Sequence, residues 1–221
     1  MNPNIEYILL VFREMLPALP QTLWICLLSF GLSVALALFV TVVDFFQVPV
    51  LRRVCNFYVS FFRGTPLVAQ LFLFYFGLPS ICQVFMAITK MQAVVLGLGF
   101  NAGAYMRESF RGAILSVDKG QLEAAYSIGM SDMKVMWRII LPQAVVVAIP
   151  SLVNNLVDIL KGSSLAFTVG VIDITAAAKL RASANFKYFH AYLALMFLYW
   201  VLVLALERGQ AVLEKRLARN R

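Results

Sequence analysis

Long apolar runs alternate with short polar connections along most of the chain. Runs of about 18 residues or more are long enough to cross the hydrocarbon core of a bilayer as helices. The predicted spans are 20–43, 57–78, 91–114, 136–160 and 189–207. Neither a linker nor an obvious repeat divides the sequence. The pattern therefore predicts an all-α integral membrane protein of about five transmembrane helices, built as a single domain over residues 1–221.

Composition and charge agree with a membrane location. Of the 221 residues, 62% are hydrophobic and 14% charged, whereas soluble domains carry about 45–50% apolar and about 25% charged residues. The net charge of +8 does not indicate nucleic acid, because the basic residues collect at the ends of apolar runs and in the tail. Cys26, Cys55 and Cys82 lie too far apart for a metal site.

Basic residues also predict the orientation, because cytoplasmic connections are enriched in lysine and arginine. A two-to-one excess places the N-terminus outside and the C-terminus in the cytoplasm. The predicted cytoplasmic set is Arg52, Arg53, Arg107, Arg111, Lys119, Lys134, Arg138, Arg208, Lys215, Arg216, Arg219 and Arg221. The opposite set is Arg13, Lys90, Lys161, Lys179, Arg181 and Lys187, and Arg63 lies within the second run.

A polar segment, EAAYSIGMSDMKVMWRIILP (123–142), stands between two apolar runs on the predicted cytoplasmic side. Glu123 suits the N-terminus of a helix. Gly129 allows a bend or a left-handed conformation, and Ser131 and Asp132 are residue types that start helices. The segment predicts a helix, a turn and a second helix, a shape that suits a groove on a soluble partner.

The spacing of this segment resembles the EAA loop of permease subunits in ABC importers. The matching residues are Glu123, Ala124, Ala125, Gly129, Ile139, Leu141 and Pro142. Two upstream stretches, FRGTPLVAQLFLFYFGLP and AYMRESFRGAILSVDKGQLEAA, are similar to the polar amino acid permease branch of that family. The resemblance covers roughly residues 15–210. It implies the fold of a type I importer permease, with residues 119–135 as the coupling helix region.

The same resemblance implies the partners. Two ATP-binding cassette subunits would receive the coupling helix, Glu123 would make a charge contact with one of them, and ATP and magnesium would bind there rather than to this chain. A second permease subunit, identical or related, would complete the path across a bacterial inner membrane. An extracytoplasmic binding protein would deliver the substrate, which is a polar amino acid; a basic amino acid, glutamine and cystine all stay open.

Polar residues within the fourth run predict a substrate path. Charged groups inside a membrane are costly and usually functional. Pro150, Asn154, Asp158 and Lys161 fall on one stripe of a helix, which we expect to face the bundle interior. Residues 162–164, Gly-Ser-Ser, then interrupt the helix, and Ser163 and Ser164 join the predicted path together with Asn154, Asp158 and Lys161.

The second run carries a similar break. Arg63 precedes Gly64, Thr65 and Pro66, and Gln70 follows one turn later. Broken helices near the midplane often bind substrates through their free ends, so all five residues are predicted to line the path. Arg63 suits a carboxylate, of the substrate or of Asp158; a snorkelling arginine and a capping serine pair are the alternatives.

The remaining features predict no chemistry of the chain's own. Gly99 and Gly103 form a GxxxG pair typical of close helix packing. The sequence has no GxxxxGK[ST] motif, and we assign no catalytic and no metal-binding residue. Two other classes stay open: a transporter driven by an ion gradient, and a membrane scaffold that recruits a soluble protein without transport. ATP dependence and substrate-stimulated ATPase activity distinguish them.

Overall fold

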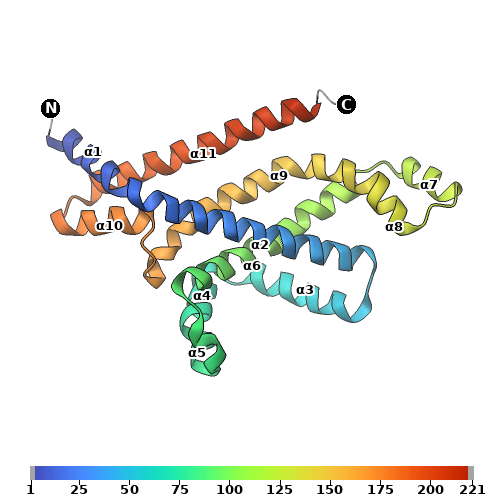
Figure 1. Ribbon diagram of the computed structural model, residues 1–221, viewed down its shortest axis with the longest axis horizontal. Coiled ribbons are helices and arrows are strands. Elements are labelled where there is room, and N and C mark those ends of the chain that lie inside the picture. Colours follow the sequence, from blue (N-terminus) through green and yellow to red (C-terminus); the bar gives the residue numbers. More distant parts are fainter. Residues whose placement is uncertain (1–2, 219–221) are drawn as a thin grey trace.

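The computed structural model describes residues 3–218, and within that range every regular element is helical (Figure 1). Arg219 and Arg221, which entered the charge count, lie outside the described residues. The α-helices, in chain order, are α1 (Pro3–Met15), α2 (Leu19–Phe45), α3 (Pro49–Gly64), α4 (Leu67–Phe72), α5 (Leu78–Ile81), α6 (Lys90–Leu115), α7 (Lys119–Ser127), α8 (Asp132–Val135), α9 (Leu141–Gly162), α10 (Ile174–Asn185) and α11 (Tyr188–Ala218).

The N-terminal part is one long helical rod. A 3₁₀ turn at Leu16–Ala18 joins α1 to α2, so that Pro3–Phe45 forms 43 continuous residues. The prolines of this stretch stand in the first positions of their helical segments, where the missing N–H has no helical partner to lose. The predicted span 20–43 is the second part of this rod; α1 was not predicted.

The centre of the molecule is α6, which packs on α2 along most of its length and on α9 with its C-terminal half (Figure 1). Small residues permit the approach to α2. A Cβ atom on Gly99 would lie 2.6 Å from Leu32, and one on Gly103 would lie 3.2 Å from Leu36. The two glycines therefore stand at the close helix contact expected of their spacing.

A second apolar core joins the two ends of the chain. Val11 and Met15 of α1 are fully buried against α10 and α11, where Ala178, Ala182 and Ala194 offer small side chains. The polar stretch before the last apolar run thus contains a helix, α10, that brings α11 back beside α1 (Figure 1). The predicted last span, 189–207, lies within the longer α11.

The second apolar run, predicted as one span over 57–78, is not a single helix. Its first part belongs to α3, which begins at Pro49 and ends at Gly64. After a break α4 follows, and Leu67–Ile81 makes an angle of 112° with Pro49–Gly64. A π-helical turn at Leu73–Gly77 leads into α5, and a 3₁₀ helix at Gln83–Ala87 follows. Residues 67–87 form an arm, which begins with α4 packed on α6 and then projects from the bundle (Figure 1).

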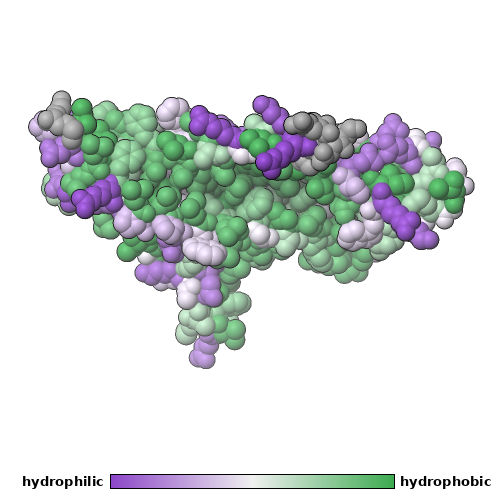
Figure 2. Space-filling model, turned by 45° about the horizontal axis from the view of Figure 1, so that its top comes forward, coloured by the Kyte–Doolittle hydropathy of each residue, from purple (hydrophilic) through white to green (hydrophobic). Residues whose placement is uncertain are grey.

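The exposed surface is apolar over most of the face seen in Figure 2, and hydrophilic residues gather at both ends of the long axis, along the upper edge and on the part that projects downward. Among the described residues, three helical stretches are long and apolar enough to cross a membrane, or four if the bent pair is one span. They are Pro3–Phe45, Asp132–Val169 and Tyr188–Arg216. Helix α6 is not one of them, although it coincides with the predicted span 91–114.

Candidate functional site

The polar segment folds as the predicted helix, turn and helix. Helix α7 ends in a Schellman motif: Met130 N–H donates to the Ala125 carbonyl over 3.1 Å, and Gly129 N–H donates to the Tyr126 carbonyl over 2.9 Å. Gly129 has φ +79°, a left-handed conformation that glycine adopts without a Cβ penalty. The turn is therefore built into the sequence at Gly129.

Two contacts fix α7 to the bundle and leave its outer face free. Ala125 is 3% exposed and packs into the main core, and the Gln143 amide of α9 donates to the Gln121 side chain over 2.7 Å. Glu123 and Ala124 are exposed. Glu123 does not stand at a helix N-terminus as expected, because α7 begins at Lys119 with Asp118 as its N-cap.

The two short helices are also tied to each other. A hydrogen bond to the Asp132 carboxylate raises the pKa of the Tyr126 phenol, so α7 and α8 meet across the turn. Ser131 is the N-cap of α8, but its side chain makes no capping hydrogen bond. The backbone carbonyl of Ser131 accepts from Val135 N–H over 2.9 Å.

Helix α8 continues into α9 within one helical stretch, Asp132–Val169. A π-helical turn, Met136–Ile140, stands between them, and Leu141 and Pro142 open α9. Pro142 has no N–H to donate to the carbonyl four residues earlier, and a π turn is a regular way to absorb such a defect. Ile139 packs against the main core. The Ile139–Pro142 part of the motif therefore belongs to the membrane-facing rod rather than to the loop.

Side-chain amides hold the bend between α3 and α4. Gln70 is 2% exposed, and its amide donates to the Phe62 carbonyl over 3.0 Å, the Thr65 carbonyl over 3.1 Å and the Thr65 hydroxyl over 2.8 Å. Asn101 of α6 donates to Phe62 and to the Gln70 side chain, each over 3.1 Å. Gln70 thus replaces the helical partners that the break removes. Asn101 was not predicted, although an amide inside an apolar run signals such a role.

Arg63 lies at the same bend but does not reach Asp158. Its guanidinium stands 3.5 Å from the Glu108 carboxylate and 5.4 Å from the ring centroid of Tyr105. Gly64 and Pro66 are exposed, and Thr65 donates its hydroxyl to the Phe61 carbonyl over 2.8 Å. Glu108 and Tyr105, both on α6, were missed because their run was interpreted only as a span.

The polar stripe of α9 faces outward from the chain, not into the bundle as expected. Asn154, Asp158 and Lys161 are all exposed. Asp158 lines a cavity of about 180 Å³ that α4, α6 and α9 enclose, together with Asn101, Tyr105 and Asn155. The bundle interior is already filled by apolar side chains of α2, α6 and α9, so a charged stripe has no place there.

The second predicted break differs from the first. Helix α9 ends at Gly162 and passes directly into a 3₁₀ helix, Ser163–Val169. Ser163 is fully buried, and its hydroxyl donates to the Leu160 carbonyl over 2.7 Å. Ser163 therefore does not line the cavity beside Asp158, and Ser164 is half-buried. The break changes the helix type without freeing a helix end.

Known proteins match the chain over nearly its full length. The family of binding-protein-dependent transport system inner membrane components matches residues 28–219. The probable amino-acid ABC transporter permease protein PatM of Vibrio harveyi is 42% identical, over 98% of this chain and 95% of the relative. The L-cystine transport system permease protein TcyL of Bacillus subtilis is 36% identical, over 91% of this chain and 86% of the relative.

A solved structure has the same arrangement of helices. The crystal structure of an amino acid ABC transporter with histidines is 32% identical in sequence, with a TM-score of 0.84. The superposition covers 92% of this chain and 94% of that chain.

Proposed function

The chain belongs to the family of binding-protein-dependent transport system inner membrane components and has the fold of a type I ABC importer permease, and we propose that it carries a polar amino acid into the cell by ATP-driven transport. ATP hydrolysis takes place on two partner ATPase subunits, which bind ATP and magnesium. The N-terminus lies outside, and residues 119–135 face the cytoplasm.

One observation carries this proposal: the exposed helix–turn–helix of α7 and α8 is rigidly connected to a spanning rod. Ala125 and the Gln121–Gln143 hydrogen bond attach α7 to the bundle, and α8 and α9 belong to one helical stretch, Asp132–Val169. A displacement of the turn is therefore transmitted to α9 and to Asp158. Glu123 and Ala124, on the exposed face, are free for contact with an ATPase subunit.

The exposed stripe on α9 supports a second permease subunit. Charged groups at membrane depth are stable only beside protein or water, and Asp158 and Lys161 are exposed on the outer face of this chain. A second copy or a related permease over this face would enclose the stripe and the 180 Å³ cavity in a common path. Alternating access then follows from the relative tilt of the two bundles.

The substrate class follows from the same cavity and from the relatives. Asn101, Tyr105, Asn155 and Asp158 offer amide, hydroxyl and carboxylate groups, and Arg63 stands over the Tyr105 ring. Carboxylate and guanidinium groups suit the ammonium and carboxylate groups of an amino acid. The named relatives are permeases for amino acids, one of them for L-cystine.

Both other classes are disfavoured. A gradient-driven transporter does not need a coupling segment exposed for an ATPase or membership of a binding-protein-dependent family. A scaffold does not need a polar cavity beside Asp158. Transport into proteoliposomes that hold ATP but no ion gradient separates the first class from the proposal. ATPase activity that rises with substrate-loaded binding protein separates the second.

The direct test is reconstitution with the ATPase and the binding protein from the same organism. Gly129→Asp disturbs the left-handed turn, and Glu123→Lys reverses an exposed charge that the fold does not use. We expect both variants to lose at least tenfold of the substrate-stimulated ATPase activity or to assemble poorly with the ATPase.

Matched controls are Gly209→Asp on α11, where a Cβ atom meets nothing within 4 Å, and Glu6→Lys on α1, at the other end of the molecule (Figure 1). Both controls should keep normal activity. Normal coupling in Glu123→Lys and Gly129→Asp would overturn the assignment of α7 and α8.

A further inference from the structure

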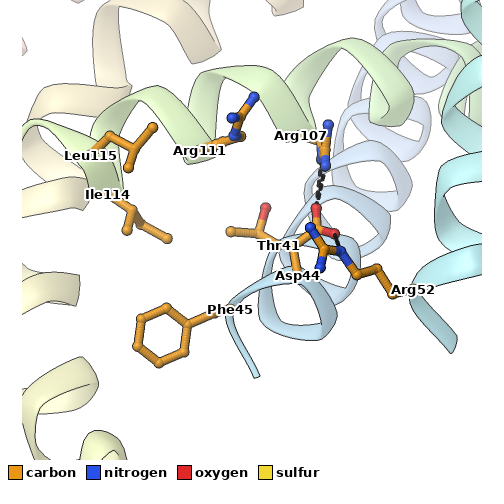
Figure 3. Close-up of a pocket in the computed structure, with 8 residues that line it drawn as sticks. All are labelled: Thr41, Asp44, Phe45, Arg52, Arg107, Arg111, Ile114 and Leu115. Carbon is orange, nitrogen blue, oxygen red and sulfur yellow. Dashed lines mark hydrogen bonds and ion pairs between the residues drawn. The ribbon is translucent and has the colours of Figure 1, made fainter. Parts of the chain in front are cut away.

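A second cavity lies away from the proposed substrate path, at the end of the bundle that carries α7 and α8. Its volume is about 310 Å³, and α2, α3 and α6 contribute its walls (Figure 3). Asp44 near the end of α2 is the carboxylate in the wall, and Arg52, Arg107 and Arg111 are the guanidinium groups. The lining therefore carries an excess of positive charge.

Arg107 forms the close ion pairs of this cluster, with the carboxylates of Asp44 and Glu108. Its Nε donates to Asp44 Oδ2 over 2.8 Å, and another of its nitrogens pairs with Glu108. The Arg107 side chain is 14% exposed. Asp44 and Glu108 each bind Arg107 closely through one carboxylate oxygen. Arg52 and Arg111 therefore face only the second oxygen of each carboxylate, at a longer distance.

Arg52 and Arg111 consequently keep donors for a further anion. Arg52 Nε lies 3.7 Å from Asp44 Oδ1, and Arg111 Nη1 lies 3.5 Å from Glu108 Oε2. Asp44 Oδ1 is buried and accepts no hydrogen bond within the described part of the chain. The two arginine side chains are 50% and 59% exposed. Figure 3 shows Arg107 and Arg52 approaching Asp44 from two sides, with Arg111 one turn along α6.

Apart from Thr41, whose hydroxyl donates to the Ala37 carbonyl over 2.7 Å, the rest of the lining is apolar. Phe45, Ile114 and Leu115 form the wall beside the arginines (Figure 3), and Leu115 is 71% exposed. A cavity with guanidinium groups on one side and apolar side chains on the other suits an amphiphilic anion. Asp44 and Phe45 directly follow the predicted span 20–43, and residues that flank a span lie at the depth of the lipid headgroups.

We infer that this cavity binds the phosphate group of an anionic phospholipid, with its acyl chains along Phe45, Ile114 and Leu115. Guanidinium groups bind phosphate oxygens in pairs, and basic pockets between helices at the cytoplasmic side take such headgroups. The choice of the cytoplasmic leaflet rests on the orientation in the proposed function. Leu115 ends α6 just before Asp118 caps α7, so a bound lipid also supports the junction with the coupling segment.

Native mass spectrometry of the purified chain tests the binding without any transport assay. The probes are phosphatidylglycerol, the zwitterionic phosphatidylcholine and inorganic phosphate. We expect wild type to bind phosphatidylglycerol at least tenfold more tightly than phosphatidylcholine. In the double variant Arg52→Gln/Arg111→Gln, we expect the preference for phosphatidylglycerol to fall about fivefold for each arginine removed. The ion pairs of Arg107 with Asp44 and Glu108 stay in place, so the fold is kept.

Arg138→Gln is the matched control, because Arg138 is exposed at the same end but does not line the cavity. It should keep the lipid preference of wild type. Equal binding of the two lipids by wild type, or an unchanged preference in the double variant, would overturn the inference. Competition by millimolar inorganic phosphate at equal strength would make this a free-anion site. A double variant that binds lipid normally but fails to assemble with the ATPase would make it a protein contact.

Discussion

Two helix interruptions at membrane depth have similar sequences and opposite structures. Gly64-Thr65-Pro66 bends the chain by 112°, whereas Gly162-Ser163-Ser164 continues α9 into a 3₁₀ helix. At the first, Thr65 has φ −120° and ψ 148° and Pro66 has ψ 135°, both extended. At the second, Ser163 keeps helical angles of φ −59° and ψ −24°.

Proline explains the difference. It disfavours the helical conformation of the residue before it, so Thr65 is driven out of the helix and the carbonyl groups at the end of α3 lose their partners. Glycine and serine permit a helix to tighten into a 3₁₀ helix. The Ser163 hydroxyl then donates to the Leu160 carbonyl, three residues earlier in the same turn. A bend therefore needs outside donors, which Gln70 and Asn101 supply, and a tightened turn needs none.

The largest effect is expected when the donor at the bend is removed. Gln70→Leu leaves the Thr65 carbonyl without its side-chain donor, and Asn101 loses one of its two acceptors and keeps only the Phe62 carbonyl. Buried polar groups left unpaired cost about 1–3 kcal/mol each, so we expect a loss of about 3 kcal/mol in the free energy of unfolding and no transport. Thermal unfolding in detergent measures the loss. Gln83→Leu, an exposed change in the same arm, should leave Tm unchanged; an equally stable Gln70→Leu would contradict this view of the bend.

An intermediate effect is expected when the cause of the bend is removed and its donors remain. Pro66→Ala keeps the Pro66 carbonyl, which accepts from Gln70 N–H over 3.2 Å, but frees Thr65 to become helical. We expect a cost of about 1 kcal/mol and a broader range of angles between α3 and the arm. Spin labels at Phe57 and Ile81, with the exposed Cys82 replaced by serine, report that angle as a distance. A distribution as narrow as that of the parent protein would show that Gln70 alone sets the bend.

The smallest effect is expected at the tightened turn. Ser163→Ala removes a hydroxyl that donates to the Leu160 carbonyl within its own turn. The change should cost about 0.5 kcal/mol and leave transport intact, because Ser163 is buried away from the cavity at Asp158. Thermal unfolding in detergent measures the cost in stability, and the reconstituted assay measures transport. Loss of transport with a normal melting temperature would return Ser163 to the substrate path.

The coupling segment shows how far a local pattern reaches. Its turn was predictable from Gly129, because whether a residue can adopt the left-handed conformation depends on its own side chain, and glycine has no Cβ to oppose it. Its anchoring was not, because Gln121 meets Gln143 only when α7 folds back on α9. Glu123 was expected at a helix start, which Asp118 in fact provides through a local contact with Gln121 N–H.

The sequence by itself determined the apolar helices, the coupling motif with its turn at Gly129, and the family. Each depends on neighbours within a few residues or on a pattern read directly along the chain. Only the tertiary structure decided that Arg63 pairs with Glu108, that Gln70 and Asn101 hold one bend, and that the stripe at Asp158 faces outward. These depend on which helix faces are already filled, and that is a property of packing between segments far apart in the chain.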